Sequence, residues 1–207
     1  MANKNGSTYG LTILSPIKGG HDRNECPVDI LRDYLRALPK GSKSPFCRVQ
    51  STHLARFSII DDVFYEGTSA REDHLKSNYL WLNSNFDGEL DDYLESMFDN
   101  MSDEIEAIWQ NCVAFPGIAA GKEKWKQYMV KCQIETTFFF AAVNDMTVDE
   151  MLRSLMLKQE FSKFAAEHQG VKAQDLQRDF LTFVEKFESE PTPPRGSIFY
   201  QFKKGGE

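Results

Sequence analysis

A histidine and an arginine stand on one short segment with the alternation of apolar residues that is typical of a β-strand. His53 and Arg56 flank apolar positions within this segment. Histidine transfers protons near neutral pH and arginine holds anions, so the pair is a candidate base and charge clamp. Strand alternation predicts that the two side chains lie on opposite faces of a sheet. The competing interpretation is a hydrogen-bonded strand histidine and a surface or interface arginine.

Aromatic and polar side chains share one face of a later apolar segment. Tyr79, Trp81 and Asn83 alternate with Leu80 and Leu82. Flat aromatic walls with a few polar groups are typical of small-molecule sites. Aromatic faces are equally typical of subunit interfaces, so the segment predicts either a ligand site or an interface.

Composition and charge exclude several classes of protein. The 207 residues are 41% hydrophobic and 27% charged, which is typical of a globular chain. Lys and Arg total 24 against 31 Asp and Glu, a net charge of -7 that argues against nucleic acid as the main partner. No signal-peptide core is present, and no segment reaches the roughly 18 apolar residues of a membrane helix. We expect a cytoplasmic protein that does not bind membranes.

Metal ligands are not grouped in this sequence. The cysteines Cys26, Cys47, Cys112 and Cys132 form no CxxC pair and have no histidine at zinc-finger spacing. We therefore predict no metal site and reduced thiols. The sequence does not decide between heme, flavin and no cofactor.

Apolar periodicity predicts four strands with helices between them. The expected order is βαββαβ, the split βαβ of a ferredoxin-like domain, in which one antiparallel sheet carries its helices on one face. Asp87 and Gly88 are expected to end the third strand and to cap the next helix. The fold class is thus α+β. The expected strands are 8–17, 53–60, 78–86 and 133–143, and the expected helices are 27–38, 90–98, 102–112 and 121–131.

Additional helices follow in the C-terminal part of the chain. Thr147 and Glu150 have the spacing of a capping box, with Met146 and Met151 at the positions of a hydrophobic staple. Because about 40 residues are near the lower limit for an independent core, we expect these helices to pack on the sheet domain. The predicted domains are a ferredoxin-like core, 1–146, and a helical extension, 147–207.

The order of the first elements resembles the ferredoxin-like, dimeric α+β barrel superfamily, which includes antibiotic-biosynthesis monooxygenases, EthD-like proteins and dye-decolourising peroxidases. The resemblance covers residues 1–143 and rests on element order. It implies a pocket between a sheet and its helices and the pairing of two sheets face to face. Asp87 and Gly88 match only part of the GxxDG heme-side motif of the peroxidases, because no Gly stands three residues before Asp87. No catalytic residue is therefore transferred.

Two functions follow as hypotheses. The first is a small-molecule-binding α+β barrel protein, for example an oxygenase or peroxidase-like enzyme, with a pocket near His53, Arg56, Tyr79 and Trp81. The alternative is a non-catalytic, homo-oligomeric interaction protein whose sheet face and C-terminal helices serve assembly.

A sheet with helices on one face leaves its other face to be covered. That face carries either Tyr79 and Trp81 or Leu80 and Leu82, so it is not fully polar. We predict a homodimer through this face, because a two-fold arrangement buries the same patch on both subunits. The alternative is a monomer in which the tail, Ile198–Phe202, or a C-terminal helix covers the face.

Overall fold

The computed structural model describes residues 2–19, 26–63, 67 and 74–197. The chain divides into two compact units, Met1–Asp145 and Met146–Glu207. The first unit holds a β-sheet with four α-helices, and the second holds a helical hairpin. The expected packing of the C-terminal helices on the sheet domain stays a prediction. The tail segment Ile198–Phe202 lies outside the described residues.

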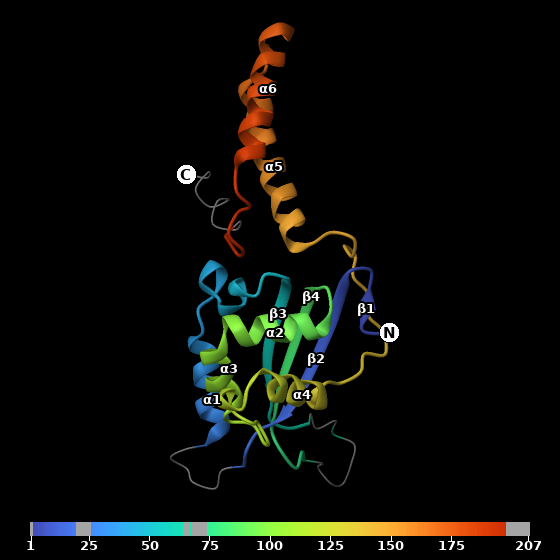
Figure 1. The fold of residues 1–207 in the computed structure, drawn as a ribbon, viewed down its shortest axis with the longest axis vertical. Coiled ribbons are helices and arrows are strands. Elements are labelled where there is room, and N and C mark those ends of the chain that lie inside the picture. Colours follow the sequence, from blue (N-terminus) through green and yellow to red (C-terminus); the bar gives the residue numbers. More distant parts are fainter. Residues whose placement is uncertain (1, 20–25, 64–66, 68–73, 198–207) are drawn as a thin grey trace. The chain divides into compact units, whose positions relative to one another are not determined.

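The sheet consists of four antiparallel strands in the spatial order β1-β2-β4-β3 (Figure 1). Strand β4 lies between β2 and β3 and pairs with both of them. The predicted α+β class with one antiparallel sheet is confirmed, and the three long strands form where alternation of apolar residues predicts them. The bounds are Lys4–Asn5 for β1, Thr8–Pro16 for β2, Thr52–Ile60 for β3 and Tyr79–Asp87 for β4.

The fourth strand predicted at 133–143 does not form, so the ferredoxin-like order is not confirmed. Only Gln133 makes an isolated bridge, to Ile13 of β2. Strand β1 pairs with the start of β2 after a turn at Gly6, whose φ of 62° suits glycine. Part of the free edge of β2 is therefore occupied by the preceding residues. The chain after Gln133 continues as an irregular strap, residues 134–144.

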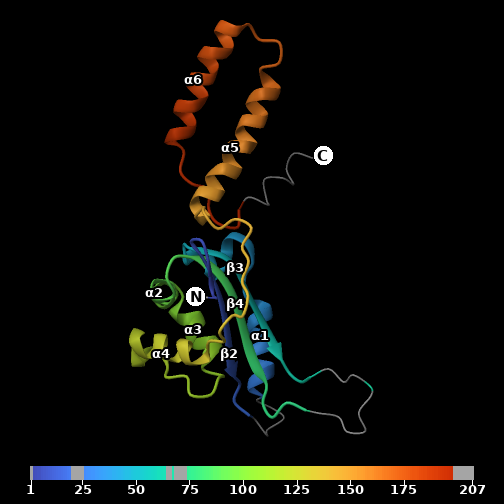
Figure 2. The ribbon, with the colours of Figure 1, turned by 90° about the vertical axis from the view of Figure 1, so that its right-hand side faces the viewer.

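Helices α2, α3 and α4 cover one face of the sheet, as Figure 2 shows. Helix α1 packs against α3 and β3. Pro27 stands at the first position of α1, where its missing N–H is not needed, as the sequence predicts. The bounds are Pro27–Ala37 for α1, Leu90–Asn100 for α2, Ser102–Trp109 for α3 and Lys122–Cys132 for α4.

Large aromatic side chains fill the space between the sheet and the helices. Trp109 and Trp125 are fully buried and meet edge to face, with ring centroids 5.1 Å apart. Phe86 of β4 stacks on Tyr93 of α2 at 3.7 Å. Leu80 and other alternate β4 residues point into this core. The opposite face of the sheet therefore carries the half-buried residues that alternate with them.

The second unit is an antiparallel pair of helices, α5 (Val148–Glu167) and α6 (Ala173–Ser189) (Figure 2). The predicted capping box is confirmed: Glu150 N donates to Thr147 Oγ1, and Thr147 N donates to the Glu150 carboxylate at 2.7 Å. Gly170, with a φ of 78°, lies in the turn between the helices. In the described part of the chain, no helix combines the length and apolarity needed to cross a membrane.

Candidate functional site

His53 is the extra residue of a β-bulge in β3. Thr52 pairs with Phe86 and Leu54 pairs with Asn85, so His53 has no partner position on β4. Its Nε2 lies 2.5 Å from Asp87 Oδ1, and both side chains are largely buried. A carboxylate in this position fixes the orientation and tautomer of an imidazole ring.

The bulge removes the predicted alternation between His53 and Arg56. Arg56 stands opposite Asn83 on the face that the helices leave open, and it is exposed. Asp87 lies on the same open face of β4. The His53 ring contacts Asp87, so the His53 side chain lies on this face as well. The expectation that the two side chains lie on opposite faces is wrong, because one inserted residue shifts a pattern of period two. Asp87 also does not cap α2, since Glu89 holds the N-cap position.

Tyr79, Trp81 and Asn83 share the open face of β4, as their alternation predicts. Trp81 Nε1 donates a hydrogen bond to Asn83 Oδ1 at 2.9 Å. Thr12 Oγ1 of β2 donates to the same oxygen at 2.9 Å. The open face of the sheet is thus a half-buried surface of polar and aromatic side chains. All four predicted site residues lie along it: His53, Arg56, Tyr79 and Trp81.

The strap covers part of this open face. The ring of Phe139 lies over Gly10 of β2, where an added Cβ atom would meet ring carbons at 2.8 and 2.9 Å. Asn144 O accepts a hydrogen bond from Ser7 N at 2.7 Å and holds the far end of the strap. Phe138 and Phe140 point to solvent, with 82% and 69% of their surface exposed. Among the described residues of the first unit, the strap thus covers part of the open face.

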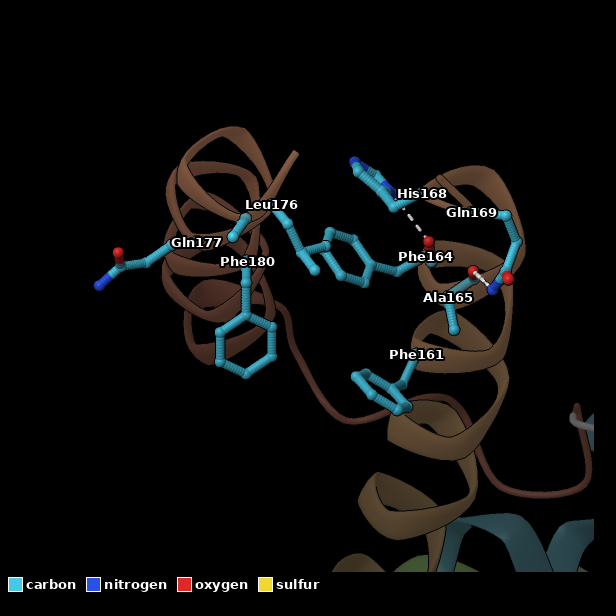
Figure 3. Close-up of a pocket in the computed structure, with 9 residues that line it drawn as sticks. Phe161, Phe164, Ala165, His168, Gln169, Leu176, Gln177 and Phe180 are labelled. Atoms are coloured by element: carbon cyan, nitrogen blue, oxygen red, sulfur yellow. Dashed lines mark hydrogen bonds between the residues drawn. The ribbon is translucent and has the colours of Figure 1, made fainter. Parts of the chain in front are cut away.

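The second unit carries a continuous apolar groove between α5 and α6, which the sequence analysis did not identify. Figure 3 shows one end of it, where Phe164 points between the helices toward α6. Phe161 and Phe180 line both this end and the adjoining end near Arg153. The cavity volumes of the two ends are about 480 and 610 Å³. We call the two ends together the hairpin groove, and its apolar lining consists of Leu157, Phe161, Phe164, Ala165, Ala173, Leu176, Phe180, Phe183, Val184 and Phe187.

The phenylalanines of the hairpin groove contact one another without becoming buried. Phe164 lies 5.1 Å from Phe183 and 6.0 Å from Phe180 between ring centroids. His168 stacks on Phe164 at 4.0 Å, and its Nδ1 lies 2.7 Å from the Phe164 carbonyl oxygen. Phe161 remains 46% exposed and Phe180 41% exposed. None of the residues from 149 to 189 is buried.

The described residues contain no group of three or more His, Cys, Asp or Glu side chains that could hold a metal ion. The cavities described above lie along the hairpin, away from His53 and Trp81 in the sequence and in a different unit. No family model, curated protein or solved structure compared with this chain matches it.

Proposed function

We propose that this protein is a non-catalytic, homo-oligomeric interaction protein that assembles through the hairpin groove. The observation that carries the proposal is the lack of any buried residue from 149 to 189, although this stretch contains five phenylalanines along one groove. Two helices alone cannot enclose an apolar core, and helices in proteins gain most of their stability from packing. The groove therefore needs a partner surface, which is either the first unit of the same chain or another chain.

A second copy of the chain is the partner that best fits the spacing of the groove. Residues that line the groove recur every seven positions on both helices. On α5 they include Ser154, Phe161 and His168, and on α6 they include Phe180 and Phe187. Leucine and phenylalanine stand at intermediate positions on both helices. This spacing is typical of the core positions of four-helix bundles. A two-fold pairing of two hairpins would build such a bundle from identical surfaces.

The exposed apolar side chains of the groove supply part of a dimer interface. A large aromatic side chain buries about 150–250 Å² when fully covered, so four side chains that are each between 38% and 46% exposed offer roughly 250–400 Å² per chain: Phe161, Phe180, Leu157 and Leu176. Specific interfaces bury about 800 Å² per partner, so the less exposed phenylalanines and the polar side chains along the groove have to supply the rest.

Light scattering of the full chain tests the proposal. We expect a mass of two chains that falls to one chain in Phe180→Glu. Leu181→Glu is the matched control, because Leu181 is 57% exposed on the same helix but does not line the groove. A monomeric wild type would refute the proposal. A dimer lost in Trp81→Glu and kept in Phe180→Glu would place the interface on the sheet face instead.

The ligand-binding alternative concerns His53, Arg56, Tyr79 and Trp81. It is supported by the His53–Asp87 contact and by the polar groups of the open sheet face. An oxygenase or peroxidase-like enzyme would carry a heme or a flavin and would show its absorption band as purified. A colourless protein that dimerises through the hairpin groove would favour the interaction protein.

A further inference from the structure

A cavity in the first unit lies between the end of β2, the loop at 113–116 and helix α4. Its volume is about 440 Å³, within the roughly 300–1,000 Å³ of small-molecule sites. One side is apolar and the other side is formed by α4. The lining contains two lysines and no carboxylate. The apolar side consists of Leu14, Pro16, Val113, Ala114 and Pro116, and α4 contributes Lys124, Gln127, Tyr128, Lys131 and Cys132.

The lysines of α4 divide into two groups with different surroundings. Lys122 and Lys126 lie against α2, where they form ion pairs with Asp99 at 2.8 Å and with Glu95 at 2.8 Å. Lys124 and Lys131 line the cavity and form no ion pair with the residues that the structure describes. Because they are seven residues apart, they lie on one side of the helix. In a chain of net charge -7, these two cations are left available to an anion.

The wall opposite the lysines is fixed by its own contacts. Val113 N donates to Pro16 O at 2.8 Å, and the Phe115 ring packs edge to face on Tyr128 and on Trp125. Ala114 has a φ of 58°, a conformation that non-glycine residues rarely adopt. Such strain persists only where the surroundings determine the backbone. The cavity is therefore formed before any ligand arrives, which lowers the entropy cost of binding.

Tyr128 contributes its ring rather than its hydroxyl to the cavity. The side chain lines the cavity and is 7% exposed, but the hydroxyl oxygen itself is buried, next to Ser15, Cys112 and Cys132. Burial raises the pKa of Tyr128, so the hydroxyl stays protonated. The polar groups that a ligand can reach are therefore the exposed side chains of α4 in the lining, those of Lys124, Gln127 and Lys131.

We infer that this cavity binds a small amphipathic organic anion. The apolar part of the ligand packs against Leu14, Pro16 and Val113, and its carboxylate or other anionic group lies between Lys124 and Lys131. The combination of an apolar wall and paired cations selects this class over neutral or cationic molecules. The site lies in the first unit and does not depend on assembly through the hairpin groove.

Octanoate serves as the probe, titrated into the full-length, ¹⁵N-labelled protein and followed by NMR and calorimetry. We expect saturable shifts in the amides of residues 113–116 and 124–132. Replacing both Lys124 and Lys131 by Ala removes two charged contacts and weakens binding by about tenfold or more. Both lysines are exposed, so the fold survives the change. Lys40→Ala with Lys43→Ala removes the same charge from exposed positions outside the cavity and leaves the affinity unchanged.

Three results would overturn the inference. Equal weakening by the two double variants would show that only net charge matters. Shifts confined to α5 and α6 would show adsorption to the hairpin groove. The absence of saturable shifts at millimolar octanoate would exclude this class of ligand. Weaker binding of 1-octanol than of octanoate is the remaining expected result, because the alcohol lacks the charge.

Discussion

Gly10 of β2 lies directly beneath the strap. Replacing Gly10 by alanine adds one methyl group, which should push the strap away from the sheet. The Phe139 ring lies where an added Cβ would be 2.8 Å from its nearest carbon, closer than any van der Waals contact. The backbone of Gly10 is in an ordinary strand, so alanine is otherwise acceptable there. Gly10→Ala must therefore push the ring of Phe139 away from the sheet.

The expected size of this effect follows from the half-buried state of Phe139. Half of the area of a phenylalanine is about 100 Å², which at about 25 cal/mol per Å² contributes at most about 2.5 kcal/mol. Replacing a strand glycine by alanine returns about 0.5–1 kcal/mol through the unfolded state. We expect Gly10→Ala to lower the free energy of unfolding, by at most about 1.5–2 kcal/mol.

Urea unfolding followed by tryptophan fluorescence measures this change. All three tryptophans, Trp81, Trp109 and Trp125, lie in the first unit, so their fluorescence reports the unfolding of that unit. In a Phe139→Ala background, Gly10→Ala should become stabilising by about 0.5–1 kcal/mol, because nothing remains to displace. The same loss of stability in both backgrounds would refute the placement of Phe139 over Gly10.

Three further predictions concern the pairing of polar groups and burial. Thr147→Ala removes the capping box of α5 and should cost about 1 kcal/mol, measured by thermal denaturation in far-UV circular dichroism; a null effect would contradict the cap. Burial raises the pKa of Cys112 to about 12, so this thiol should alkylate more slowly at pH 8 than Cys132, as mass spectrometry of peptides would show. Hydrogen bonds from Leu75 N, His74 and Val63 N lower the pKa of Asp62 to about 2. Because the folded pKa lies below the ordinary value near 4, the stabilisation is present above pH 4 and is lost as the pH falls toward 2; an NMR titration of Asp62 with a midpoint near 4 would contradict this.

The long strands were predictable because the sheet has one buried face. Leu80 and Leu82 alternate with half-buried residues, and this period of two marks a strand directly. The segment with Phe138 and Phe140 has the composition of a strand but forms a strap with both rings in solvent. Strand β1, which pairs with the edge of β2 in place of that segment, has only two residues, Lys4–Asn5. Two residues are too few to show a pattern of alternation. Composition therefore could not decide which segment pairs with the edge of β2.

The candidate sites were less visible in the sequence for two physical reasons. The bulge at His53 inserts one residue, and no periodic pattern reveals it. Along α5, Ser154 and His168 interrupt the apolar residues that line the groove, Leu157, Phe161 and Phe164, so the stripe on this side of the helix is incomplete. On α6 the same positions hold Phe180 and Phe187, which belong to an apolar stripe visible in the sequence, but the sequence does not show that this stripe faces α5 across a groove. The groove appears once the two helices are paired.

Intermolecular nuclear Overhauser effects test assembly through the hairpin groove most directly. A mixture of ¹³C-labelled and unlabelled chains gives signals only from contacts between two copies. We predict such signals at the rings of Phe161 and Phe180, because a second hairpin covers them in the dimer. Intermolecular signals confined to Tyr79 and Trp81 of the sheet face, or no intermolecular signals at concentrations where light scattering reports two chains, would contradict the proposed interface.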